Sequence, residues 1–461
     1  MAAEFSDGPS RKSDGYSGRR YERISLWNGF GMILAVFLYM SMNSPTNALN
    51  GSREARIAKL GEKEKPRVNL RFLDGLRGLS ALYVLLYHLY TPAGLPRSSV
   101  LLLSGLRFGH YAVAVFIVLS GYCLMLPVAR GDGTLRGGTL AFIKRRARRI
   151  LPPYYAALVL SLGFSALAMH NLIAMHTTVP EGEWRDSISP GSLISHLFLV
   201  HNFNRVWSVS IDSPMWSVAT EWQIYFFFPL ILLPVWRRFG SLAVILAGII
   251  VGVAPLLLLP ARHNLSWACP QFIGLFAIGM AAASQNKESG PDKERKELPW
   301  AVLSGAGFAA FFLIAFYLGV VKARPLGASG ELPLSYPWIG DVLFGLATGA
   351  LLIYCEQTTI RSGKGKPLPL LLRLLTSRAA MALGAFSYSL YLVHFPLVVY
   401  SGKLLHHFFE SQMVVSTLQL IVAVPVIMLI SYSFHIVFER PFMSLPAKAR
   451  ISIELGKEAR N

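Results

Sequence analysis

Hydrophobic residues in this chain fall in blocks of about twenty, separated by short polar segments. A helix needs about 20 apolar residues to cross roughly 30 Å of hydrocarbon, so each block predicts a membrane-spanning helix. The ten blocks are approximately 72–92, 107–128, 150–170, 216–236, 240–260, 267–284, 299–320, 337–356, 379–401 and 414–438. The pattern therefore predicts an all-α, polytopic membrane helical bundle of about ten core transmembrane helices.

The segments outside this core differ from it in composition. Residues 1–25 are rich in Ser, Gly, Arg and Asp, which predicts a disordered basic tail. Residues 26–42 are apolar but short, and are either an extra transmembrane helix, an interfacial helix or a signal-anchor. Residues 43–69 read as a basic linker and 443–461 as a cytoplasmic tail. The predicted membrane domain is therefore 70–442.

Charge decides between a nucleic-acid partner and a lipid bilayer. The formal net charge is +19, but the lysines and arginines lie in short loops instead of gathering on one face with aromatic residues. If the residues before Leu73 face the cytoplasm, the cytoplasmic segments hold 30 basic residues and the opposite segments hold 8. This bias follows the positive-inside rule. It predicts no nucleic acid, a cell-membrane location, and residues 129–149 and the C-terminus in the cytoplasm.

The remaining composition agrees with a membrane domain. The chain is 53% hydrophobic and only 15% charged, whereas soluble chains are nearer one-quarter charged. Cys123, Cys269 and Cys355 lie in or at the edges of apolar blocks without CxxC spacing. We therefore expect neither a disulfide framework nor a metal site.

The first core block carries three ionisable residues, Asp74, Arg77 and His88. Such residues are costly inside a membrane and are functional candidates by default. Arg77 and His88 are eleven residues apart, so they share a helix face and lie about 16 Å apart along the axis. Asp74 precedes Arg77 by three and can pair with it. Arg77 and His88 are therefore expected to serve different ends of one pathway.

Depth along the spans brings further residues to the level of His88. The fourth block begins at Trp216 and runs inward, which places Glu221 in the outer half of the membrane. The ninth runs outward and places His394 at a similar depth. A histidine with such partners is a plausible general base. The alternatives are a satisfied core histidine at 394, an interfacial Glu221 and a structural Asp74–Arg77 pair.

A basic cluster precedes the third block and contains Arg146 and Arg149. A cytoplasmic flank of this kind satisfies the positive-inside rule by itself. Arginines at i and i+3 can also present a forked donor surface to phosphates. Topology is the default interpretation of the cluster, and phosphate binding needs support from outside it.

Six segments together resemble the acyltransferase-3 family of polytopic membrane acyltransferases. They are LDGLRGLSALYVLLYH (73–88), FIVLSGYCLM (116–125), KRRARRILPPYY (144–155), WSVATEWQIYFFFPL (216–230), SYSLYLVHFPL (387–397) and FERP (438–441). They occur in the family's order from about residue 70 to 442. One such match would be weak evidence, but six in order are strong.

The resemblance implies a function and assigns roles to matching residues. Members generally transfer an acyl group from cytoplasmic acyl-CoA to a hydroxyl, often on a cell-surface glycan. The family's first-span arginine and presumed catalytic histidine correspond to Arg77 and His88, and its RxxR motif to Arg146 and Arg149. Some members carry a C-terminal hydrolase-like domain. No such domain is expected after the last span here, which leaves the acceptor less defined than the donor.

The resulting hypothesis is an acyltransferase that uses acyl-CoA, most simply acetyl-CoA, as donor substrate without a bound cofactor. The predicted catalytic residues are His88, Glu221 and His394, with His88 as the general base. The predicted substrate-binding residues are Arg77, Asp74, Arg146, Arg149, Trp216 and Ser120. The alternatives are a proton-coupled transporter that uses the intramembrane His, Glu and Arg as a relay, and a non-catalytic scaffold.

Overall fold

The computed structural model describes residues 70–90, 103–169, 188–260, 265–285, 298–318, 336–362 and 367–443, together with residues 332 and 334. Every regular element within these ranges is a helix, which confirms the all-α prediction. All of them belong to one compact unit, Arg53–Asn461. The predictions for 1–25, 26–42 and 43–69, and for the tail beyond Met443, lie outside the described residues.

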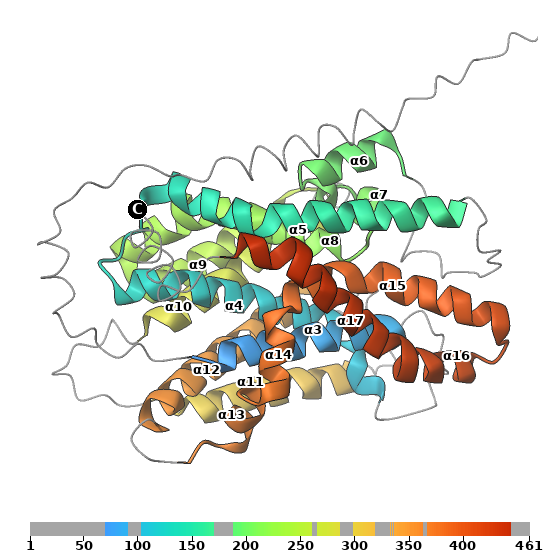
Figure 1. Ribbon diagram of the computed structural model, residues 1–461. Helices are drawn as coiled ribbons and strands as arrows, with labels where there is room; N and C mark the ends of the chain where they lie inside the picture. The colour runs from blue at the N-terminus through green and yellow to red at the C-terminus, as the bar shows by residue number, and fades with distance from the viewer. Residues whose placement is uncertain are drawn as a thin grey trace, which may run out of the picture. The chain divides into compact units, whose positions relative to one another are not determined.

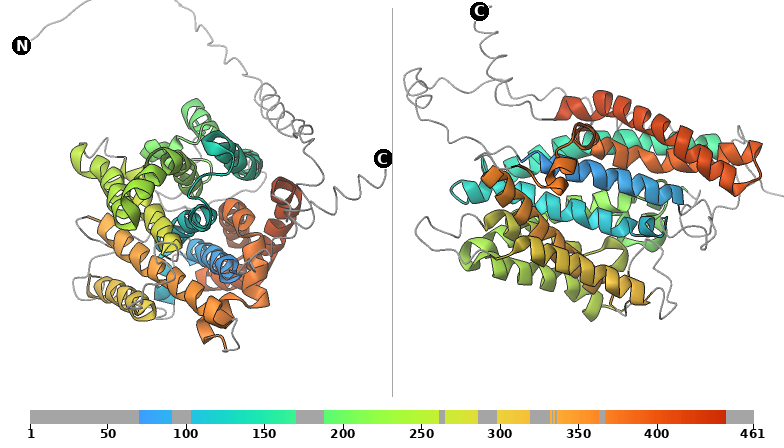
Figure 2. Two further views of the ribbon diagram at one scale, coloured as in Figure 1. Left: turned by 90° about the vertical axis from the view of Figure 1, so that its left-hand side faces the viewer. Right: turned by 90° about the horizontal axis from the view of Figure 1, so that it is seen from below.

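The long helices run side by side as a bundle (Figure 1). They are α3 (Phe72–Tyr90), α4 (Gly109–Arg130), α5 (Gly138–Met169), α8 (Met215–Phe227), α9 (Leu233–Leu258), α10 (Phe272–Ser284), α11 (Trp300–Phe316), α12 (Trp338–Ser362), α15 (Ser387–Phe408) and α17 (Val424–Phe434). Shorter helices connect them, among them α6 (Pro190–Leu197), α7 (Arg205–Ser208), α13 (Leu370–Leu375), α14 (Arg378–Ala385) and α16 (Gln412–Leu418). In end view α3 and α4 lie near the middle, with α10, α12, α14 and α15 packed around them (Figure 2).

Many of these helices are apolar enough to cross a membrane. Six helical stretches of the described chain qualify by length and composition, or seven if the bent pair α14–α15 counts as one span. The chain is therefore a multi-pass membrane protein. Each of the ten predicted ranges holds a helix, but α11 has only 17 residues, and the fourth and fifth ranges form one stretch, Met215–Leu258. That stretch breaks at Gly240, whose φ is 81°. The predicted count of ten core spans is not confirmed.

Glycines allow α4 and α10 to pack with their backbones in contact. A Cβ at Gly121 would lie 2.0 Å from the carbonyl oxygen of Phe276, and one at Gly279 would lie 2.0 Å from that of Val118. Small residues at such crossings are typical of membrane helices, because dispersion contacts replace the hydrophobic effect as the driving force there. This contact fixes α4, which contributes the longest wall of the candidate site.

A second close approach joins α13 and α14 to α3. A Cβ at Gly384 would lie 2.1 Å from the carbonyl oxygen of Asp74, and one at Gly75 would lie 1.7 Å from that of Leu375. The chain then bends by 74° between α14 and α15. The start of α15 is thereby held beside the first two turns of α3, where Asp74 and Arg77 lie.

Candidate active site

A cavity of about 430 Å³ lies between the central helices. Seven residues of α4 line it at helical spacing, from Val113 to Pro127, so that wall is about 21 Å long. The other walls come from α3, α5, α8, the α14–α15 junction and the end of the described chain. They are Asp74, Arg77, Arg146, Arg149, Ile150, Ser217, Val218, Glu221, Tyr225, Gly384, Ala385, Ser387, Tyr388, Tyr391, Glu439 and Met443.

Arg77 is held in this cavity by two partners. Its Nη1 donates to Asp74 Oδ1 over 3.1 Å, which is the predicted i, i+3 pair. Its Nη2 lies 2.9 Å from the Sγ of Cys123 on α4. About a quarter of the Arg77 side chain stays exposed, so the guanidinium can still receive an anionic ligand.

The arginines of the 144–149 cluster divide into two groups. Arg146 and Arg149, which the i, i+3 spacing places on one helix face, line the cavity, whereas Arg145, Arg148 and the neighbouring Lys144 do not. Arg146 also lies 6.0 Å above the ring of Phe142. Two cluster arginines and Arg77 therefore form one basic part of the cavity wall.

Glu221 lies in the cavity within its own hydrogen-bond chain. The Tyr225 hydroxyl donates to Glu221 Oε1 over 2.6 Å. The Ser120 hydroxyl lies 3.2 Å from the Tyr225 oxygen and, because the Tyr225 proton is committed to Glu221, is the donor there. These two hydrogen bonds link α4 to α8 at the level of the basic residues. Ser120 lines the cavity, and its role in substrate binding stays a prediction.

His88 and His394 meet, as their depths predicted. The Nε2 of His394 lies 3.1 Å from the Nδ1 of His88, and the ring centroids are 5.0 Å apart. His394 is buried at 1% exposure. Glu221 does not join them: its hydrogen bond in the described part of the chain goes to Tyr225. The expected three-residue cluster is therefore wrong, because Glu221 points to the cavity from α8 and the histidines pair beyond it.

The surrounding carbonyls determine which ring nitrogens carry protons. His394 Nδ1 lies 2.7 Å from the oxygen of Tyr391, so it must donate and Nε2 must accept. His88 Nδ1 faces that acceptor and the oxygen of Val84, 3.0 Å away, so it must be the donor. The Nε2 of His88 then carries the lone pair. In neutral form this nitrogen is the proton acceptor of the pair.

Tyr391 separates the cavity from the histidine pair. Its ring lies 5.7 Å from that of His394 and 5.9 Å from that of Phe116. Its hydroxyl lies 2.6 Å from Ser217 Oγ and 3.1 Å from the oxygen of Pro214. The cavity lining ends at Tyr391, and neither histidine is part of it.

Glu439 is a cavity residue that the sequence reasoning assigned no role. It belongs to the FERP segment, is 3% exposed, and accepts from Ser389 Oγ at 2.6 Å. His435 Nδ1 lies 2.8 Å from the same carboxylate oxygen. The available signal was a carboxylate directly after the last apolar block, one helical turn after a histidine.

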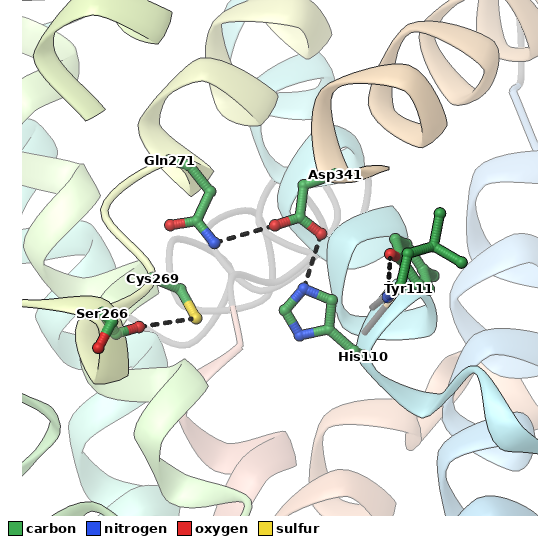
Figure 3. Close-up of polar contacts among 7 residues, drawn as sticks. His110, Tyr111, Ser266, Cys269, Gln271 and Asp341 are labelled. Atoms are coloured by element: carbon green, nitrogen blue, oxygen red, sulfur yellow. Dashed lines mark hydrogen bonds and ion pairs between the residues drawn. The ribbon is translucent and has the colours of Figure 1, made fainter. Parts of the chain in front are cut away.

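A buried cluster outside the cavity was also missed (Figure 3). His110 Nε2 lies 2.7 Å from Asp341 Oδ1, and Gln271 Nε2 donates to Asp341 Oδ2 over 2.9 Å. The three side chains join the beginnings of α4, α10 and α12. Asp341 at the start of an apolar block was the visible signal. Trp216, predicted to bind substrate, does not line the cavity and instead stacks on His110, with ring centroids 6.3 Å apart.

Known proteins resemble this chain over most of its length. O-acetyltransferase OatA of Staphylococcus aureus (strain NCTC 8325 / PS 47) is 26% identical over 343 residues, which cover 71% of this chain and 50% of that protein. Peptidoglycan O-acetyltransferase OatA of Listeria monocytogenes is 24% identical over 349 residues, 72% of this chain and 50% of that protein. Putative peptidoglycan O-acetyltransferase YrhL of Bacillus subtilis is 26% identical over 346 residues, 71% and 48% respectively.

The chain spans about half the length of these relatives, and no solved structure matches it. The family described as "Acyltransferase domain" matches residues 70–436. That range contains the cavity arginines, the histidine pair and nearly all of the described helices. This chain belongs to that acyltransferase family.

Proposed function

We propose that this protein is an integral membrane O-acyltransferase. It moves an acyl group, in the simplest case acetyl, from cytoplasmic acyl-CoA to a hydroxyl of a glycan or another surface or lipid-linked acceptor. The observation that carries this proposal is the course of the cavity. It begins among Arg77, Arg146 and Arg149 and ends at Tyr391, directly against the His88–His394 pair.

The orientation in the membrane follows from the basic residues. With about ten crossings and residues 129–149 in the cytoplasm, the arginine part of the cavity faces the cytoplasm and the histidine pair lies toward the opposite side. The cell membrane is the expected location. An acyl group would then enter from the side where acyl-CoA is made and leave toward the surface.

The donor would bind through its phosphates and its pantetheine arm. Arg146 and Arg149 offer planar donors suited to bidentate phosphate binding, and Arg77 lies further along the same wall. Asp74 positions Arg77 through the 3.1 Å contact. Glu221 and Ser120 hold the Tyr225 hydroxyl at the cavity wall, where it can contact the extended arm.

Transfer itself needs one proton acceptor and no covalent intermediate. His88 Nε2 takes the proton of the acceptor hydroxyl while that oxygen attacks the thioester carbonyl. The carbon–sulfur bond then breaks, and the leaving CoA thiolate takes up the proton held on His88 Nε2, which returns His88 to its neutral form. His394 holds the His88 ring through the Nδ1 contact of 3.1 Å. The Tyr391 ring closes the donor site while acyl-CoA binds, and it must turn aside once the acceptor has bound so that the two substrates meet.

The acceptor is proposed from the relatives alone. Two of them are named for peptidoglycan, so glycan strands of that polymer are the first acceptor to test. Purified wild-type protein in liposomes would receive radiolabelled acetyl-CoA and glycan strands. We expect label on the glycan with wild type and with His407→Ala, a histidine near the end of α15, but not with His88→Ala. Equal transfer by wild type and His88→Ala would refute the mechanism.

The histidine pair also fits the proton relay of a transporter, because two rings in contact can pass a proton. The transporter and the acyltransferase predict different experimental results. Uptake of a solute driven by a pH gradient without acyl-CoA would favour transport. Acyl-CoA binding that is lost in Arg146→Ala would favour the acyltransferase.

A further inference from the structure

The far end of the cavity differs in chemistry from its basic part. On α4 the lining beside the arginines is mixed and consists of Ser120, Cys123, Leu124 and Pro127, whereas beyond Ser120 it is wholly apolar and consists of Ile117, Phe116 and Val113. Val218 on α8 adds an apolar side chain at the same end. Because its cationic side chains all lie in the basic part, the cavity fits a ligand with a charged or polar body and a small apolar tip.

Side chains from three helices close this apolar end. The outermost lining residues are Val113 on α4, Ser217 on α8 and Tyr391 on α15. The Phe116 and Tyr391 rings meet edge to face with centroids 5.9 Å apart. The hydroxyl pair Ser217–Tyr391, at 2.6 Å, ties α8 to α15 behind them. Tyr391 is 8% exposed and Val218 is 3% exposed, so both side chains of this wall are held in place by packing.

We infer that Phe116, Val218 and Tyr391 form the acyl-chain end of the donor site and restrict the protein to short acyl groups. This inference rests on the proposed function, because it assigns the apolar tip to the acyl group of acyl-CoA. When the pantetheine arm of acyl-CoA binds between the arginines and Ser120, the acyl carbons reach the contact between the Phe116 and Tyr391 rings. An acetyl group fits before that contact, and a longer chain must displace it.

Equilibrium binding tests the inference without knowledge of the acceptor. The dissociation constants of the purified protein for CoA, acetyl-CoA, butyryl-CoA and hexanoyl-CoA would be compared. A hydrophobic pocket discriminates roughly 10–200-fold for one misfitting methylene, so wild type should bind butyryl-CoA at least about tenfold more weakly than acetyl-CoA. In Phe116→Ala that ratio should fall to about one, because the removed ring leaves room for the added methylenes.

Two further variants guard against an effect on folding. Val218→Ala removes volume from the opposite wall. It should also lower the ratio of the dissociation constants for butyryl-CoA and acetyl-CoA. Val115→Ala removes the same atoms from a buried position of α4 outside the cavity lining, and should keep the wild-type ratio.

The outcomes separate this inference from the proposed function. An unchanged ratio in folded Phe116→Ala and Val218→Ala, or equal binding of acetyl-CoA and hexanoyl-CoA by wild type, would overturn the inference and leave the acyltransferase intact. If wild type binds no acyl-CoA at all, the proposed function fails and the inference fails with it.

Discussion

His394 Nε2 lies 3.1 Å from His88 Nδ1, and the oxygen of Tyr391 accepts the proton on the other nitrogen of His394. The backbone of α15 therefore determines the protonation of His394, and His394 in turn determines that of His88. A single turn of one helix controls which nitrogen on another helix can accept a proton. In the proposed mechanism His394 is therefore a positioning residue.

His394→Phe should lower the rate of acyl transfer without weakening donor binding. Phenylalanine keeps the ring volume but cannot accept the His88 proton, so His88 Nε2 loses its orientation. Because general-base catalysis contributes roughly 10²–10⁴-fold, we expect kcat to fall by about tenfold to a hundredfold. The dissociation constant for acetyl-CoA should be unchanged. A wild-type kcat in His394→Phe would contradict the positioning role.

Neutralising one arginine of the 144–149 cluster should weaken donor binding only if that arginine lines the cavity. A hydrogen bond to a charged group contributes about 1.5–3 kcal/mol, so Arg149→Gln should raise the dissociation constant for acetyl-CoA roughly 10–150-fold. Arg148→Gln is the matched control, because Arg148 is exposed and outside the lining. Equal effects of both variants would mean that the cluster acts only through its overall charge.

Asp341→Ala should destabilise the bundle without a direct effect on the cavity. It leaves His110 and Gln271 without their shared carboxylate, and removing one member of a buried pair costs roughly 3–5 kcal/mol. Thermal unfolding in detergent should show a clear fall in Tm. The double variant His110→Phe with Asp341→Leu should recover part of the loss, since apolar replacements of buried ion pairs are often neutral. A Tm equal to wild type in Asp341→Ala would contradict this account.

Gly121→Ala should disrupt the contact between α4 and α10. The new methyl group would meet the Phe276 carbonyl oxygen at 2.0 Å, so the two helices must separate and lose contacts along their length. Gly305→Ala in α11 is the control, because no atom lies within 4 Å of its added Cβ. There the substitution should be neutral or stabilise by about 0.5–1 kcal/mol through helix propensity. Yield and Tm of both variants measure the difference, and comparable values would argue against the packing role of Gly121.

The pattern of apolar blocks was sufficient to predict the all-α class, because the bilayer imposes both helix and length on any crossing segment. It could not decide the number of spans, since α11 is short and Gly240 breaks one long stretch. The spacing of residues within one helix was equally reliable for predicting which side chains share a helix face. The Asp74–Arg77 pair and the shared placement of Arg146 and Arg149 followed from helical periodicity, and both hold in the structure.

Contacts between helices were decided by the tertiary structure alone. Equal depth was correct for His88 and His394 but misleading for Glu221, because depth says nothing about the direction in which a side chain leaves its helix. The same limit hid Glu439 and the His110–Asp341 pair, whose partners lie on helices distant in sequence or across a break. Local periodicity thus determined the helices and their faces. The close packing of glycines and the bend before α15 determined which faces meet, because those contacts depend on the whole bundle.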